Sequence, residues 1–266
     1  MAQSTTTGSA TGPATAPAPA ETRPVALWRR AVAEALGTAA LVAIVVGSGI
    51  MATELSDDTG LRLLENSLAT TLGLAVLIAV LGPVSGAHLN PVVSLVDWVT
   101  ARRAGPQGGG GAADRRSAAR ARLTTAGVYV PAQVVGGIAG AVLANAMFGL
   151  PTTLATHERA TAPHLLAEVV ATAGLVLVIL GLLRSGRETW VPAAVGSYIG
   201  AAYWFTSSTS FANPAVTVGR MVSDTFAGIA PGSVLPFIGA QLLGGAVAVG
   251  LASVLFPAVR EEQARR

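Results

Sequence analysis

The sequence predicts an all-α membrane protein with six transmembrane helices, two re-entrant half-helices and an inverted-topology internal repeat. Three observations predict it: an apolar composition, six long apolar runs, and a set of motifs that occurs twice in the same order. Of the 266 residues, 52% are hydrophobic and only 12% are charged. A soluble domain carries about a quarter charged residues. We therefore expect the chain to lie in a lipid bilayer.

The composition also excludes several classes of function. The chain has no cysteine, which excludes disulfides, thiol catalysis and cysteine-ligated metal clusters. Its three histidines, His88, His157 and His164, are too scattered to suggest a metal site, so we expect neither a metal nor a cofactor. The net charge of +3 comes from arginines that are dispersed among apolar runs, which argues against a nucleic-acid partner.

The apolar runs are the candidate membrane spans. Several approach the roughly 20 residues that a helix needs to cross a bilayer core. The first run is too long and begins too late for a signal peptide, so we expect it to be retained. The six runs lie at residues 25–51, 67–84, 124–150, 165–183, 191–205 and 234–256.

The termini differ from these runs. Residues 1–24 are mostly Ala, Thr, Ser, Gly and Pro, which cannot bury enough apolar surface to offset the entropy of ordering, so they are predicted to be a disordered tail. Residues 258–266 are expected to form a short second tail. The channel domain is then predicted at 25–257, with repeats at about 25–150 and 160–257.

Two apolar segments, 90–99 and 213–222, are too short to span a bilayer as helices. Because an unpaired backbone cannot face lipid, both must be buried in protein or line a water-filled cavity. They are predicted to be re-entrant.

The arginines predict the orientation. Fourteen lie in the two tails and in the loops on the same side of the membrane, and three lie on the opposite side. Cytoplasmic loops carry the excess of basic residues. Both termini are therefore expected in the cytoplasm, with the chain in the inner (plasma) membrane.

The repeated motifs indicate a duplication. E-x-x-x-T-A-x-L-V begins at Glu34 and again at Glu168, and A-Q-x-x-G-G contains Gln133 in the first half and Gln241 in the second. Each half has three spans, so the second half enters the membrane from the opposite side. Such repeats place their permeation site at the midplane between the halves.

Asn-Pro opens each short segment, and this pattern is typical of a helix start. Asn is a favoured N-cap, and Pro at the first helical position gives up a hydrogen bond that would be missing anyway. Inversion brings the two starts together, so their positive ends should repel cations and protons while a neutral solute passes. We expect the amides of both Asn residues to point at a passing oxygen. The motifs are Asn90-Pro91-Val92 and Asn213-Pro214-Ala215.

Glu34 and Glu168 are ionisable groups inside spans, which makes them functional candidates. They could couple protons in an active transporter. The favoured interpretation is that each accepts hydrogen bonds from unpaired backbone N–H groups of a re-entrant loop. Gln133 and Gln241 are expected to satisfy backbone groups in the same way.

Together, S-G-A-H-L-N-P-V at 85–92, F-A-N-P-A at 211–215 and the paired Glu and Ala-Gln elements resemble the major intrinsic protein family, the aquaporins and aquaglyceroporins. The resemblance covers about residues 25–257 and implies the aquaporin fold, a pore in every protomer and a homotetramer. It also implies that His88 faces the cytoplasmic vestibule in a static hydrogen bond; a pH gate is the alternative.

One departure from the family concerns the outer filter. Most members have an arginine directly after the second Asn-Pro-Ala box, where this chain has Val216. Counting along the motifs without gaps places the other filter positions at Thr70, Ala201 and Ser210. Four small, uncharged side chains predict a wide constriction that is less selective for water. Arg220 is expected to point outward, and the segment after Val216 resembles bacterial members that pass arsenite.

These observations predict a passive channel for small neutral solutes, glycerol-like or metalloid hydroxy species such as arsenite. A water or glycerol channel of ordinary selectivity is the alternative, and a proton-coupled transporter using Glu34 and Glu168 is a weaker one. An enzyme is not expected, because no nucleophile pairs with a histidine and no loop carries a phosphate-binding motif. The polar residues near 157–164 are expected to form a solvated loop.

Overall fold

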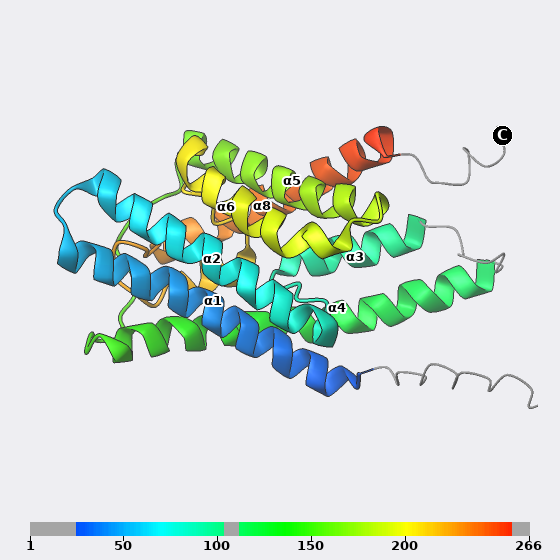
Figure 1. Cartoon of the computed structure of the whole chain (residues 1–266), viewed down its shortest axis with the longest axis horizontal. Coiled ribbons are helices and arrows are strands. Elements are labelled where there is room, and N and C mark those ends of the chain that lie inside the picture. Colours follow the sequence, from blue (N-terminus) through cyan, green and yellow to red (C-terminus); the bar gives the residue numbers. More distant parts are fainter. Residues whose placement is uncertain (1–24, 104–111, 257–266) are drawn as a thin grey trace, which may run out of the picture.

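The computed structural model describes residues 25–103 and 112–256. The two predicted tails, residues 1–24 and 258–266, lie outside the described residues. Within this part the chain is helical, with no β-strand (Figure 1). The elements are α1 (Leu27–Leu55), α2 (Thr59–Ser85), α3 (Pro91–Arg103), α4 (Ala112–Met147), α5 (Ala162–Arg184), η1 (Glu188–Trp190), α6 (Val191–Phe205), α7 (Pro214–Arg220) and α8 (Pro231–Leu255).

The helices form a bundle in which the two halves of the chain repeat one arrangement. Helix α1 packs on α4 in the first half and α5 packs on α8 in the second, while α2 and α6 join the halves. The start of α1 and the end of α8 lie at the same end of the bundle (Figure 1). The described chain therefore crosses the bundle an even number of times.

The six predicted spans correspond to α1, α2, α4, α5, α6 and α8. Five of these helices are long and apolar enough to cross a membrane. Helix α6 has only 15 residues, which is about 22 Å at 1.5 Å per residue and less than the roughly 30 Å of a bilayer core. Its crossing therefore depends on the segments that flank it, including the short helix η1.

Two helices extend beyond their apolar runs. Helix α4 begins at Ala112, where the sequence predicted a loop up to residue 123, and α2 begins at Thr59 instead of 67. Ala and Arg are good helix formers, so the polar start of α4 is helical although hydropathy does not mark it. Asp58 caps α2, because its Oδ1 accepts a hydrogen bond from Leu61 N at 2.8 Å.

The two short segments form half-helices that begin where the Asn-Pro motifs predict. Asn90 Oδ1 accepts a hydrogen bond from Val92 N at 2.9 Å. Asn213 Oδ1 accepts from Ala215 N at 3.0 Å and from Val216 N at 3.3 Å. Both side chains therefore satisfy backbone donors that have no partner inside the helix.

Glycines in α4 let this helix approach the half-helix α7. A Cβ at Gly137 would lie 2.5 Å from Ala215 O, whereas a Cβ at Gly127 on the same helix would meet nothing within 4 Å. We expect Gly137→Ala to destabilise the protein by about 1–3 kcal/mol, since one helix must shift. Gly127→Ala should stay within about 0.5 kcal/mol. Thermal unfolding of the two purified variants checks this, and equal melting temperatures would show that the helices have room to move.

Candidate transport pore

A cavity of about 300 Å³ runs between the two halves of the chain. Its wall consists of α1, α2, α5 and α6, both half-helices and the loops that precede them, and most of the lining side chains are apolar. Within the described part of the chain, α4 and α8 contribute no lining residue. These two helices support the wall from behind.

The two half-helix starts meet at the wall of this cavity. Asn90 Nδ2 donates a hydrogen bond to Ala212 O at 2.8 Å, and Asn213 Nδ2 donates to Leu89 O at 2.7 Å. Each Asn therefore reaches across to the carbonyl before the other Asn. Since an amide NH2 has two hydrogens, only one of them per side chain remains for a solute.

The loops before the half-helices share an unusual backbone. Ala87 and Leu89 have φ of 46° and 49°, and Ser210 and Ala212 have φ of 54° and 48°. These residues lie three and one positions before Asn90 and Asn213. The left-handed conformation costs a non-glycine residue roughly 1 kcal/mol or more, so both loops need support from their surroundings.

Glu34 supports the first loop. Its Oε1 accepts hydrogen bonds from Ser85 Oγ at 2.6 Å and His88 N at 3.0 Å. Its Oε2 accepts from Leu89 N at 2.6 Å and Gln133 Nε2 at 2.7 Å. The Glu34 side chain is fully buried, and its carboxylate is the acceptor for all four of these donors.

Glu168 supports the second loop in the same way. Its Oε1 accepts from Ser208 Oγ at 2.6 Å and Phe211 N at 2.9 Å. Its Oε2 accepts from Ala212 N at 2.8 Å and Gln241 Nε2 at 2.7 Å. Each carboxylate oxygen of the pair thus has two donors, and neither Glu34 nor Glu168 lines the cavity. This geometry favours the support role over proton coupling.

The two glutamines link these carboxylates to the half-helices. Gln133 Nε2 also donates to Ser94 Oγ of α3 at 3.0 Å, and Gln241 Nε2 donates to Thr217 Oγ1 of α7 at 2.9 Å. Each half-helix is therefore held both at its start and along its first turn.

At the end of the cavity near α7, the structure differs from the gapless count. Thr70, Ser210 and Val216 line the cavity, but Ala201 does not and lies exposed on the outer face of α6. Tyr203 lines the cavity instead, and its hydroxyl oxygen is 3.1 Å from Thr70 Oγ1. Side chains two positions apart on an α-helix point in directions that differ by about 200°. A count that is wrong by two residues therefore selects a side chain on the wrong face of the helix. The i, i+4 spacing of Val195, Ile199 and Tyr203 would have indicated this face.

Arg220 also differs from the expectation that it points outward. It is only 3% exposed and lines the cavity. Its Nε donates to Ala227 O, and its guanidinium carbon lies 3.5 Å from the centroid of the Phe211 ring. The end of the cavity near α7, called the outer end after the predicted orientation, therefore contains an aromatic side chain and a cation, in contrast to the four small, uncharged side chains predicted.

Most residues of the loop at 157–164 are exposed, as the solvated loop predicts, but Arg159 is buried. Arg159 is only 8% exposed, and it donates from Nε to Gly228 O at 2.7 Å and from Nη2 to Phe226 O at 3.0 Å. Burial lowers the pKa of Arg159 to about 10, so it remains a cation at neutral pH. Glu158 is exposed and accepts a hydrogen bond from Ser233 Oγ, and the half-buried His164 has its Nδ1 2.8 Å from Arg159 O.

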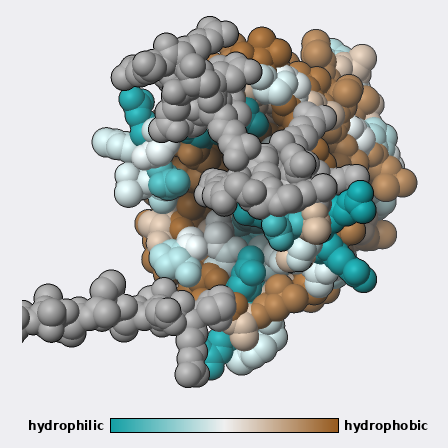
Figure 2. Space-filling view, turned by 90° about the vertical axis from the view of Figure 1, so that its right-hand side faces the viewer, coloured by the Kyte–Doolittle hydropathy of each residue, from teal (hydrophilic) through white to brown (hydrophobic). Residues whose placement is uncertain are grey.

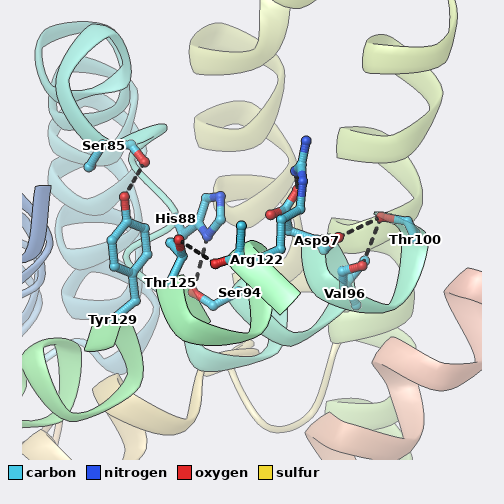
Figure 3. Close-up of polar contacts among 10 residues, drawn as sticks. Ser85, His88, Ser94, Val96, Asp97, Thr100, Arg122, Thr125 and Tyr129 are labelled. Carbon is cyan, nitrogen blue, oxygen red and sulfur yellow. Dashed lines mark hydrogen bonds and ion pairs between the residues drawn. The ribbon is translucent and has the colours of Figure 1, made fainter. Parts of the chain in front are cut away.

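His88 lines the opposite part of the cavity and is held on several sides. Its Nδ1 is 3.1 Å from Ser94 Oγ, and its ring meets the Tyr129 ring edge to face at 5.4 Å (Figure 3). Nearby, Asp97 of α3 pairs with Arg122 of α4. These contacts support a static role for His88.

The end of the bundle shown in Figure 2 carries hydrophilic residues, whereas hydrophobic residues cover much of the flank. This distribution agrees with a molecule whose flank faces lipid and whose end in this view faces water.

Known proteins resemble this chain in sequence and fold. The family model described as "Major intrinsic protein" matches residues 21–106. "Aquaglyceroporin AqpS" of Rhizobium meliloti (strain 1021) is 50% identical over 226 residues, covering 85% of this chain and 89% of that protein. The "Glycerol uptake facilitator protein" of Pseudomonas aeruginosa is 29% identical and covers 84% and 87%. The X-ray structure of the aquaglyceroporin from Plasmodium falciparum has the same fold, with a TM-score of 0.60, 20% identity and coverage of 90% and 99%.

Proposed function

Because the chain belongs to the major intrinsic protein family and is a channel for small neutral solutes, we propose that it passes glycerol-like polyols and metalloid hydroxides such as arsenite. The observation that carries this proposal is the cavity, which has a mostly apolar wall and polar groups at a few places, among them Asn90 and Asn213. A solute with both hydroxyl groups and an apolar face fits such a wall. Val216 adds to the width, because it stands where most family members have an arginine.

A second candidate is a water or glycerol channel of ordinary selectivity. Tyr203 and Arg220 favour it, since they return an aromatic ring and a cation to the outer end of the cavity. The two candidates differ in how the flux of large solutes compares with that of water.

Stopped-flow permeation into proteoliposomes distinguishes them. We expect glycerol and arsenite to equilibrate faster than in protein-free vesicles. Uptake should stop at equal concentrations even when a pH gradient is imposed, because the carboxylates of Glu34 and Glu168 are occupied. Permeation of water alone would contradict the proposal, and uphill uptake driven by a pH gradient would establish proton coupling.

We also expect the channel to exclude protons. Two helix N-termini face the centre of the cavity, and each presents roughly half a positive charge. Proteoliposomes that equilibrate glycerol should therefore keep a pH gradient as long as protein-free vesicles do, as reported by an enclosed pH-sensitive dye. A proton leak that grows with the amount of protein would contradict the electrostatic argument.

The proposed setting is the inner membrane, with both termini in the cytoplasm and four copies in a homotetramer. Each protomer would have its own pore. The roles proposed for the pore residues are those given above: Asn90 and Asn213 at the midplane, Glu34, Glu168, Gln133 and Gln241 as support, and His88 in the vestibule. Native mass spectrometry tests the assembly, and protease access to the termini in oriented vesicles tests the topology.

A further inference from the structure

The outer end of the cavity holds a buried cation without an anionic partner. Among the described residues, ion pairs form between Arg62 and Asp57 and between Arg122 and Asp97, and neither includes Arg220. The carboxylate of Glu168, which supports the neighbouring loop, is already occupied by four donors. A buried charge without a counter-ion is unfavourable unless other groups stabilise it.

Three groups stabilise Arg220 in place. Its Nε donates to Ala227 O, its guanidinium stacks on the Phe211 ring, and it lies in the last turn of α7, where the helix end is partly negative. These contacts use one nitrogen and one face of the guanidinium. Among the described residues, the side chain of Arg220 makes its hydrogen bond through Nε, and neither terminal nitrogen makes one. Because Arg220 lines the cavity, they are available to a solute.

Two groups next to Phe211 add to this arrangement. Ser210 lines the same cavity and is 4% exposed, and its hydroxyl has no hydrogen-bond partner within the described ranges. Arg159 lies 5.3 Å from the centroid of the same Phe211 ring and adds a second positive charge. The end of the cavity therefore combines positive charge with unused donors.

We propose that Arg220 and Ser210 form a binding site for a small planar oxyanion, and that its occupancy blocks the pore. The two terminal nitrogens of an arginine match the two oxygens of a carboxylate in a bidentate pair. Ser210 supplies a third donor. The block rests on the proposed channel function, whereas the binding does not.

Formate is the probe, since it is the smallest carboxylate and is ionised at neutral pH. Binding is measured on the purified full-length protein in detergent by titration of ¹³C-formate, observed by NMR. The block is measured separately as the loss of water permeability of proteoliposomes in the presence of formate. We expect saturable binding and a block that follows the same concentration dependence.

The variants separate this site from general charge effects. Arg220→Gln should weaken formate binding by about tenfold or more, since it removes a charged donor pair, and Ser210→Ala should weaken it several-fold. Arg62→Gln is the matched control, because it removes an arginine that does not line the cavity. Its binding should equal that of the wild type.

Each outcome is decisive. No saturable binding to the wild type, or equal binding to Arg220→Gln, overturns the site. If Arg220→Gln does not fold, Ser210→Ala and Arg220→Lys decide, because lysine keeps the charge but lacks the bidentate edge and should bind more weakly. Binding without any loss of water flux overturns the block. A wild type that binds formate but passes neither water nor glycerol overturns the proposed function and leaves the site in place.

Discussion

Glu168→Ala is expected to destabilise the protein severely. The substitution leaves four buried donors without their acceptor: Ser208, Gln241 and the backbone N–H groups of Phe211 and Ala212. Each unsatisfied buried donor costs roughly 1–3 kcal/mol. The total for four donors approaches the free energy of unfolding of a typical protein, which is about 5–15 kcal/mol. The left-handed loop before Asn213 also loses its support. We expect little folded protein in size-exclusion chromatography and a strongly lowered melting temperature.

Two controls accompany this variant. Glu168→Gln keeps one acceptor oxygen and should be milder. Glu158→Ala removes an exposed loop carboxylate that, among the described residues, accepts a hydrogen bond from Ser233, and it should fold normally. If Glu168→Ala and Glu168→Gln both fold as stably as the wild type yet lose transport equally, the carboxylate has a role in transport and the support role is wrong.

Val216→Arg is expected to reduce glycerol and arsenite flux by about tenfold or more. Val216 is 5% exposed and lines the cavity, so a longer side chain at this position must enter the pore. It would also place a second guanidinium close to Arg220, and a bulky charged constriction excludes larger solutes before it excludes water. Stopped-flow measurements of water, glycerol and arsenite on one preparation give the comparison.

Val216→Leu is the matched control for this variant, because it adds bulk without charge. It should lower the glycerol flux less than Val216→Arg does. Unchanged glycerol flux in Val216→Arg would mean that the solute does not pass residue 216, and the cavity described here would not be the route.

The sequence alone was sufficient to predict the features that depend on local signals. Hydropathy identified the six long helices except for the polar starts of α2 and α4, the Asn-Pro motifs identified the starts of both half-helices, and the duplicated motifs paired Glu34 with Glu168. These inferences succeed because lipid offers no hydrogen bonds, so every break in a helix needs a nearby partner within the protein. A buried hydrogen-bond acceptor that accompanies a short apolar segment can therefore be recognised in the sequence.

Residues at the outer end of the cavity required the tertiary structure. Ala201 and Tyr203 lie on different sides of α6. A count along the chain does not define how a helix is rotated about its own axis, so it cannot tell which of the two faces the cavity. Arg220 and Arg159 looked solvent-facing in the sequence, yet both are buried against the Phe211 ring. Their positions depend on carbonyl groups at Phe226, Ala227 and Gly228 in one loop, and Arg159 comes close to that loop only when segments almost 70 residues apart within the second half of the chain have packed together.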